Sequence, residues 1–183
     1  GELWSQPAPT ERTGRETGVT RWAGRRMPYE LARTVRVDAD GAVHVQYALT
    51  NRGDVPLPFL WSAHPLLPLT PDTRLELPIA ARVRVWAEHG IDLGGEGAEH
   101  RWPMLRVAGR EVDFTRPAGA ARGYACKLFL DLPRPRGGRV RAAIEQGGAR
   151  LEVEVDPAEV PNFGLWLNHG GWTPFDGGTP YLN

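Results

Sequence analysis

The chain has 183 residues, of which 41% are hydrophobic and 24% charged, and its 22 basic and 22 acidic residues cancel. This composition predicts one ordinary globular domain over residues 1–183, and zero net charge gives no field toward nucleic acid or an anionic membrane. No apolar stretch approaches the roughly 20 residues that cross a bilayer, and no signal peptide is recognised, so neither a membrane nor nucleic acid is an expected partner.

Period-two alternation recurs along the chain, whereas helical periodicity is almost absent. Val43, Val45, Tyr47 and Leu49 fall on one phase of such a segment, which predicts one buried and one solvated face. The many Gly and Pro residues suit short turns, so we expect an all-β fold, a large antiparallel β-sandwich. The predicted strands are 18–22, 29–37, 42–49, 56–62, 74–77, 81–87, 105–108, 110–114, 124–132, 139–144, 150–156 and 163–168.

The segment Phe59–Pro68 carries indole, imidazole and two prolines. Indole faces stack on the C–H faces of sugar rings, and imidazole titrates where a proton shuttle must work, so Trp61 and His64 are candidate site residues. Proline has no N–H to donate to a ladder, so the predicted strand 56–62 should end near His64. The alternative is that His64 is an ordinary hydrogen-bonded histidine.

The segment 88–104 contains a Gly-rich stretch and is predicted to be the longest loop. His89 and His100 lie at its two ends, and His44 falls on the polar phase of its strand. The sequence contains no tight cluster of His, Cys, Asp and Glu, so we expect no metal site.

Cys126 alternates with its neighbours in a predicted strand, which favours a buried free thiol. A lone cysteine cannot form a disulfide within the chain, which favours a reducing, cytoplasmic location. Of the 22 basic residues, 21 are arginine and only Lys127 is lysine. Codon bias explains this imbalance; alternatively, position 127 requires a compact ammonium group.

The segment 162–172 gathers Trp166, Asn168, His169 and Trp172 around a pair of glycines, which can let the backbone approach a ligand closely. Trp166 alternates with two leucines and should face away from them. It is either a core residue or a platform for a sugar ring. His169 is either a ligand contact or an incidental member of a Gly-rich turn.

Three stretches make the chain resemble the galactose mutarotase-like family of aldose 1-epimerases. Trp61–Leu66 resembles the family's His-Pro segment, Thr73–Pro78 the strand that follows it, and Asn162–Asn168 the late strand before the catalytic glutamate. Gly1–Ser5 resembles the sequence after the family's early His-Gly segment. The resemblance spans essentially the whole chain and implies a super-sandwich with a sugar cleft.

The resemblance implies a cofactor-free isomerase that interconverts the α and β anomers of a hexose or a derivative. His64 matches the family's general acid, which protonates the ring oxygen, and the implied sugar contacts are Trp61, Lys127, Trp166, Asn168 and His169. The family's general-base glutamate is expected beyond Asn183, so we expect an internal fragment with weak or no activity by itself. The alternative is a non-catalytic carbohydrate-binding module; the sequence predicts neither the sugar nor the oligomeric state.

Overall fold

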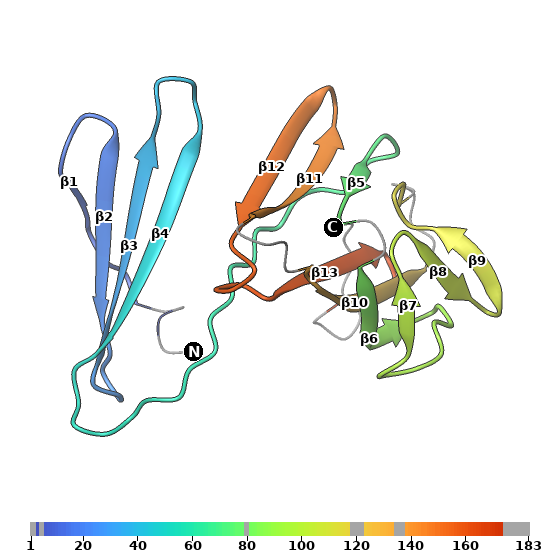
Figure 1. Cartoon of the computed structure of the whole chain (residues 1–183), viewed down its shortest axis with the longest axis horizontal. Coiled ribbons are helices and arrows are strands. Elements are labelled where there is room, and N and C mark those ends of the chain that lie inside the picture. The colour runs from blue at the N-terminus through green and yellow to red at the C-terminus, as the bar shows by residue number, and fades with distance from the viewer. Residues whose placement is uncertain (1–2, 4–5, 79–80, 118–122, 134–137, 174–183) are drawn as a thin grey trace. The chain divides into compact units, whose positions relative to one another are not determined.

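The computed structural model describes residue 3 and residues 6–78, 81–117, 123–133 and 138–173. Within these ranges the chain is built of antiparallel β-strands without an α-helix, which confirms the predicted all-β sandwich class (Figure 1). The chain divides into two compact units, Gly1–Ala63 and His64–Asn183, and each is described by itself. The expectation of one domain over residues 1–183 stays a prediction, and Gly1–Ser5, apart from Leu3, lies outside the described residues.

The first unit holds a four-stranded antiparallel sheet in the order β1-β2-β3-β4. Leu31 pairs with Leu49 and Val35 with Val45, so the apolar phase that the sequence predicts for β4 is shared with β3. This phase is not buried in the described structure, because Val45 is 49% exposed and Leu49 is 37% exposed. The strand bounds are β1 Thr10–Arg12, β2 Thr17–Ala23, β3 Tyr29–Val37 and β4 Val43–Asn51.

The predicted strand 56–62 was wrong, since these residues pair with no strand in the described part of the chain. Pro56 and Pro58 alternate at its start, and neither can donate a ladder hydrogen bond. The apolar composition of this segment imitates a strand, but its backbone cannot pair as one. The extended stretch continues to Thr70.

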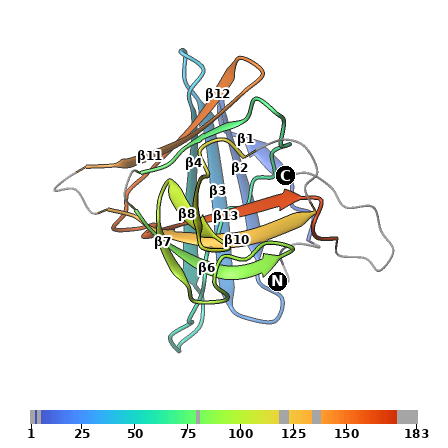
Figure 2. The same cartoon turned by 90° about the vertical axis from the view of Figure 1, so that its right-hand side faces the viewer.

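The second unit holds a six-stranded sheet in the order β13-β10-β6-β7-β8-β9, in which β10 lies between β6 and β13 (Figure 2). Strand β7 lies inside the segment 88–104, which the sequence predicted to be a loop. It was not predicted because it pairs with β6 over only three residues, too few to show an alternating pattern. The bounds are β6 Arg82–His89, β7 Glu99–Arg101, β8 Met104–Val107, β9 Arg110–Asp113, β10 Tyr124–Asp131 and β13 Asn162–His169.

A three-stranded sheet in the order β12-β11-β5 packs against this larger sheet. Leu75 of β5 and Ile144 of β11 join a core that includes Val83, Val85 and Leu128 of the six-stranded sheet. Strands β6 and β10 place alternate residues in this core, Val83 and Val85 from β6 and Cys126, Leu128 and Leu130 from β10, as the sequence alternation predicts. The bounds are β5 Arg74–Glu76, β11 Val140–Gln146 and β12 Ala149–Val155.

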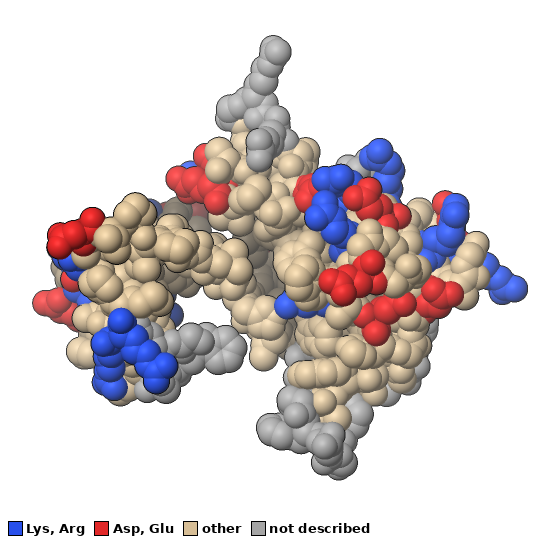
Figure 3. All heavy atoms as spheres, turned by 90° about the horizontal axis from the view of Figure 1, so that it is seen from below, with Lys and Arg blue, Asp and Glu red and all other residues tan. Residues whose placement is uncertain are grey.

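The surface of the second unit carries acidic and basic side chains side by side, as the space-filling view shows (Figure 3). Arg82 lies between Glu99 and Asp131, and Arg141 lies between Glu152 and Glu154. Acidic and basic residues are thus balanced locally on this surface, as they are over the whole sequence. In the described ranges, no helix has the length and apolar character needed to span a bilayer.

Cys126 is fully buried among the core residues of β10, which confirms the predicted buried thiol. Burial, with a smaller effect of the Glu88 carboxylate, raises the pKa of this thiol from 9.0 to about 12. Only the thiolate is a strong nucleophile, so the folded protein holds Cys126 in its unreactive form.

Native protein is therefore expected to resist N-ethylmaleimide at pH 8 and to react fully in urea, followed by mass spectrometry. Above pH 9 the unfolded thiol ionises while the folded thiol stays protonated, so the unfolded state binds fewer protons. Stability should fall by up to about 1.4 kcal/mol per pH unit between pH 9 and 12. Cys126→Ala should remove this slope from urea-unfolding curves, and rapid labelling of the native protein would contradict the assignment.

Candidate functional site

The outward face of strands β6, β10 and β13 carries the sequence-predicted residues Lys127 and Trp166 as direct cross-strand neighbours. Leu128 and Leu167 point into the core, so the alternation sends Lys127 and Trp166 to the opposite side of the sheet. Trp166 does face away from the two leucines beside it, as predicted. Both side chains are half-buried, and the Lys127 ammonium lies 5.7 Å from the centre of the Phe129 ring.

A β-bulge brings a further indole to this face. The pairing of β10 with β6 shifts between Lys127 and Leu128, so that Ala87 pairs with Lys127 while Val85 pairs with Leu128. Trp86 is the extra residue, and it is 55% exposed. Its ring meets the Phe129 ring edge to face, with centroids 5.8 Å apart. Bulges of this kind commonly redirect a side chain beside a binding site.

Trp172 returns to the same face from the turn after β13. Its ring packs edge to face on Trp166, with centroids 5.4 Å apart. The side chain of Asn168 holds this turn, because its amide nitrogen donates to the Trp172 carbonyl at 2.9 Å and its amide oxygen accepts from the Trp172 N–H at 3.3 Å. Asn168 is fully buried, so it positions the turn rather than presenting its amide to solvent.

We call the set Trp86, Lys127, Phe129, Trp166 and Trp172 the aromatic face. It holds two edge-to-face ring pairs and one ammonium group, which lies near the Phe129 ring on the residue that pairs with Trp166. Gly164 pairs with Phe129 across the strands and leaves room for that ring, since a Cβ there would lie 3.3 Å from Phe129 Cε1. Such a surface offers flat apolar area and one strong hydrogen-bond donor, which is the combination that a sugar ring requires.

His169 lies on the core-facing side of β13 and is fully buried. Its imidazole stacks on the Tyr124 ring with centroids 4.3 Å apart and planes 18° apart. The structure therefore does not bring His169 onto the aromatic face with Lys127 and Trp166. Its predicted contact with a sugar has no support from this geometry.

His64 and Trp61 lie in the extended stretch that includes residues 56–70. His64 is exposed, and no hydrogen bond or ion pair connects it to another described residue. Trp61 belongs to the first unit, where its ring packs on Tyr47 with centroids 5.1 Å apart. No described contact joins His64 to the aromatic face, and His64 follows an unpaired segment rather than the end of a strand.

Three members of the aromatic face, Trp86, Phe129 and Trp172, were not predicted from the sequence as site residues. Phe129 lies two positions after Lys127 and could have been placed on the same face by alternation alone. Trp172 stood within the segment 162–172 but only the fold of the turn directs it to Trp166. The sequence could not place Trp86 on this face, because the direction of its side chain depends on the β-bulge between β6 and β10.

Two other histidines, His100 and His44, make hydrogen bonds within the protein. His100 donates from Nε2 to the Leu93 carbonyl at 2.9 Å, and its Nδ1 accepts from the Arg106 N–H at 3.1 Å. His44 contacts the Asp38 carboxylate at 2.6 Å on the exposed surface of the first unit. Among the residues that the structure describes, no three His, Cys, Asp or Glu side chains are grouped to hold a metal ion.

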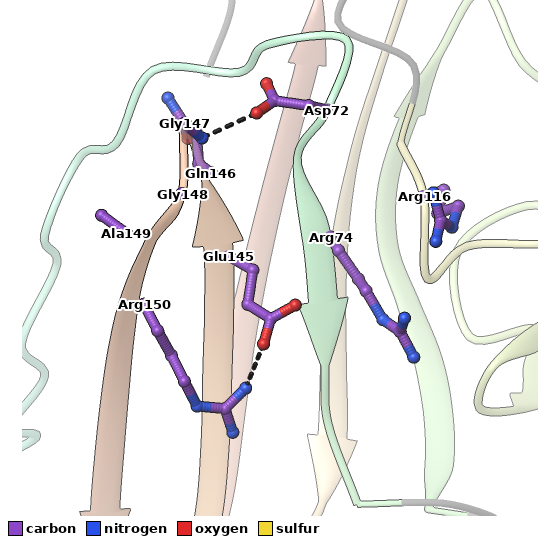
Figure 4. Close-up of a pocket in the computed structure, with 9 residues that line it drawn as sticks. All are labelled: Asp72, Arg74, Arg116, Glu145, Gln146, Gly147, Gly148, Ala149 and Arg150. Carbon is purple, nitrogen blue, oxygen red and sulfur yellow. Dashed lines mark hydrogen bonds and ion pairs between the residues drawn. The ribbon is translucent and has the colours of Figure 1, made fainter.

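A second feature of this unit is a hollow of about 350 Å³ beside the turn between β11 and β12 (Figure 4). Arg150 lies there with its guanidinium 2.6 Å from Glu145 and 2.8 Å from Glu76. The lining residues are Asp72, Arg74, Arg116, Glu145, Gln146, Gly147, Gly148, Ala149 and Arg150.

Most charged side chains that line this hollow form hydrogen bonds or ion pairs with other residues of the protein. Asp72 accepts from the Gly147 N–H at 2.7 Å and from the Thr70 hydroxyl at 2.6 Å, and the Thr70 and Gly147 hydrogen bonds lower its pKa. Arg74 lies 3.7 Å from Glu76. These contacts tie the β11–β12 turn to the chain before β5. The hollow is therefore a structural feature, and the aromatic face is the better candidate site.

Comparison with known proteins gives one relative. No family model matches the chain, and no solved structure matches it. The chain is 28% identical over 129 residues to "Uncharacterized protein YphB" of Escherichia coli (strain K12), and the match covers 70% of this chain and 39% of that protein. The chain thus spans about two fifths of the length of the relative it matches.

Proposed function

We propose that the chain binds an aldose on the aromatic face. The single observation that carries this proposal is the pair of edge-to-face ring contacts, Trp86 with Phe129 and Trp166 with Trp172, around Lys127. A contiguous apolar patch on the surface of a soluble protein commonly marks a binding site. A pyranose ring can place its C–H face on an indole while a hydroxyl accepts from the ammonium group.

We further propose that the whole protein interconverts the α and β anomers of that sugar in the cytoplasm. The support is the resemblance of Trp61–Leu66 and Asn162–Asn168 to aldose 1-epimerases, together with the lone cysteine. In this proposal His64 protonates the ring oxygen, a base takes the proton of the anomeric hydroxyl, and the C1–O5 bond breaks. Rotation about C1–C2 and closure in the opposite sense then give the other anomer.

The alternative proposal is a non-catalytic carbohydrate-binding module. It is supported by the fact that Trp166 and Lys127 lie together, while no described contact joins His64 to them. Both proposals share the aromatic face and differ only in whether anomers are exchanged. A sugar that binds and does not mutarotate faster would favour the module.

Trp166→Ala is expected to weaken sugar binding by roughly thirtyfold, because truncating a central aromatic anchor costs about 2 kcal/mol. Titration of the chain with D-glucose and D-galactose, followed by saturation-transfer NMR and tryptophan fluorescence, measures the change. The matched control is Phe59→Ala, which removes an exposed ring of the first unit and should leave the affinity unchanged. Failure of both sugars to bind the unmutated chain would sink the proposal for simple hexoses.

A further inference from the structure

Lys127 stands on the aromatic face as a cation without an acidic partner. No ion pair or hydrogen bond connects its ammonium group to a described residue, and its one described contact is with the Phe129 ring at 5.7 Å. The side chain is half-buried on β10, the second strand of the six-stranded sheet, opposite Trp166 on one neighbouring strand and Ala87 on the other. The group is thus partly removed from water and only weakly compensated by the protein.

Two acidic groups of this sheet, Asp131 of β10 and Glu99 of β7, are engaged by other residues. Asp131 accepts from Arg82 and from the Asn162 amide, the latter at 2.8 Å. Glu99 of β7 lies 3.3 Å from Arg82 and 3.8 Å from Arg84. The arginines of this face are therefore satisfied by the protein's own carboxylates, whereas Lys127 is not.

We propose that the aromatic face selects an anionic saccharide, one that carries a carboxylate or a phosphate. This inference rests on the proposed function and adds the ligand's charge to it. A charge-assisted hydrogen bond from the ammonium to an anionic oxygen is about twice as strong as one to a neutral hydroxyl. The surrounding rings lower the local polarity and strengthen that contact further.

The geometry suits one sugar unit. Cross-strand neighbours on one face of a sheet lie about 4.5–5.5 Å apart between Cβ atoms, comparable with the width of a pyranose ring. A ring stacked on Trp166 would therefore place an exocyclic acidic group beside Lys127. The Phe129 ring lies 5.7 Å from the ammonium and offers no hydrogen-bonding group of its own. A compact ammonium fits between the ring pairs, which gives position 127 a reason to be lysine in a chain that otherwise uses arginine.

The test is a set of titrations with D-glucose, D-glucuronate, D-glucose 6-phosphate and inorganic phosphate. We expect one of the two charged sugars to bind at least tenfold more tightly than glucose, with a preference that shrinks as NaCl rises from 0.05 to 0.5 M. Lys127→Met should abolish the preference, so that the charged sugars bind this variant no more tightly than glucose does. Lys127→Arg should restore part of it. The two charged sugars distinguish a carboxylate from a phosphate ligand.

Other outcomes overturn the inference. Equal affinity for glucose and both charged sugars would refute charge selection while leaving sugar binding itself intact. A preference that survives in Lys127→Met would place the anion elsewhere. Inorganic phosphate that binds as tightly as the phosphosugar would mean an adventitious ion only. If neither glucose nor a charged sugar binds, the proposed function fails together with this inference.

Discussion

Gly171→Ala is expected to destabilise the second unit by at least about 3 kcal/mol, at the upper end of the cost of overpacking. A Cβ at this position would lie 2.2 Å from the carbonyl carbon of Tyr124, 2.3 Å from its Cα and 2.5 Å from the Ala125 nitrogen. All three are backbone atoms of β10 and cannot rotate aside. The turn would have to lift away and lose the hydrogen bond from Gly171 to the Tyr124 carbonyl.

This turn carries Trp172 onto Trp166, so Gly171→Ala should also weaken sugar binding. Urea unfolding followed by circular dichroism measures the stability, and the NMR titration measures the affinity. Gly14→Ala is the matched control, because a Cβ there meets nothing within 4 Å and the change should stay within about 0.5 kcal/mol. A Gly171→Ala protein as stable as the control would show that the turn is not packed on β10 as described.

His64→Gln is expected to lower the protein-dependent rate of mutarotation by about 10²–10⁴-fold, the usual contribution of a general acid or base. Glutamine keeps a polar side chain of similar size but cannot deliver the proton. Sugar affinity should be largely retained, because glutamine can still donate a hydrogen bond to the ring oxygen and the rings of the aromatic face stay in place. This split between rate and affinity separates a catalyst from a binding module.

Polarimetry of freshly dissolved α-D-glucose and α-D-galactose measures the rate, and the charged sugars are followed by one-dimensional NMR of their anomeric protons. The assay should compare this chain with the longest reading frame that contains it, since the known relative is much longer. His44→Gln is the control, as His44 is an exposed histidine paired with Asp38. A His64→Gln protein with an unchanged rate would remove His64 from the mechanism.

The all-β class and most strands could be predicted from the sequence, because alternation of apolar and polar residues is a local property. Strand β12 shows this most clearly, since Leu151, Val153 and Val155 alternate with charged residues and pair with β11. The same reasoning failed for residues 56–62, where apolar composition was right but Pro56 and Pro58 deny the backbone its partners. Short strands such as β7 cannot be predicted in this way, because three residues are too few to show an alternating pattern.

By itself the sequence determined which residues could carry chemistry: the lone lysine, the tryptophans of 162–172 and the buried thiol at Cys126. Only the tertiary structure decided which of them meet. The pairing of β10 with β13 places Lys127 beside Trp166, the bulge adds Trp86, and the hydrogen bonds of Asn168 bring in Trp172. The physical reason is that register, bulges and turn contacts depend on pairing between segments distant in the chain, which no local pattern specifies.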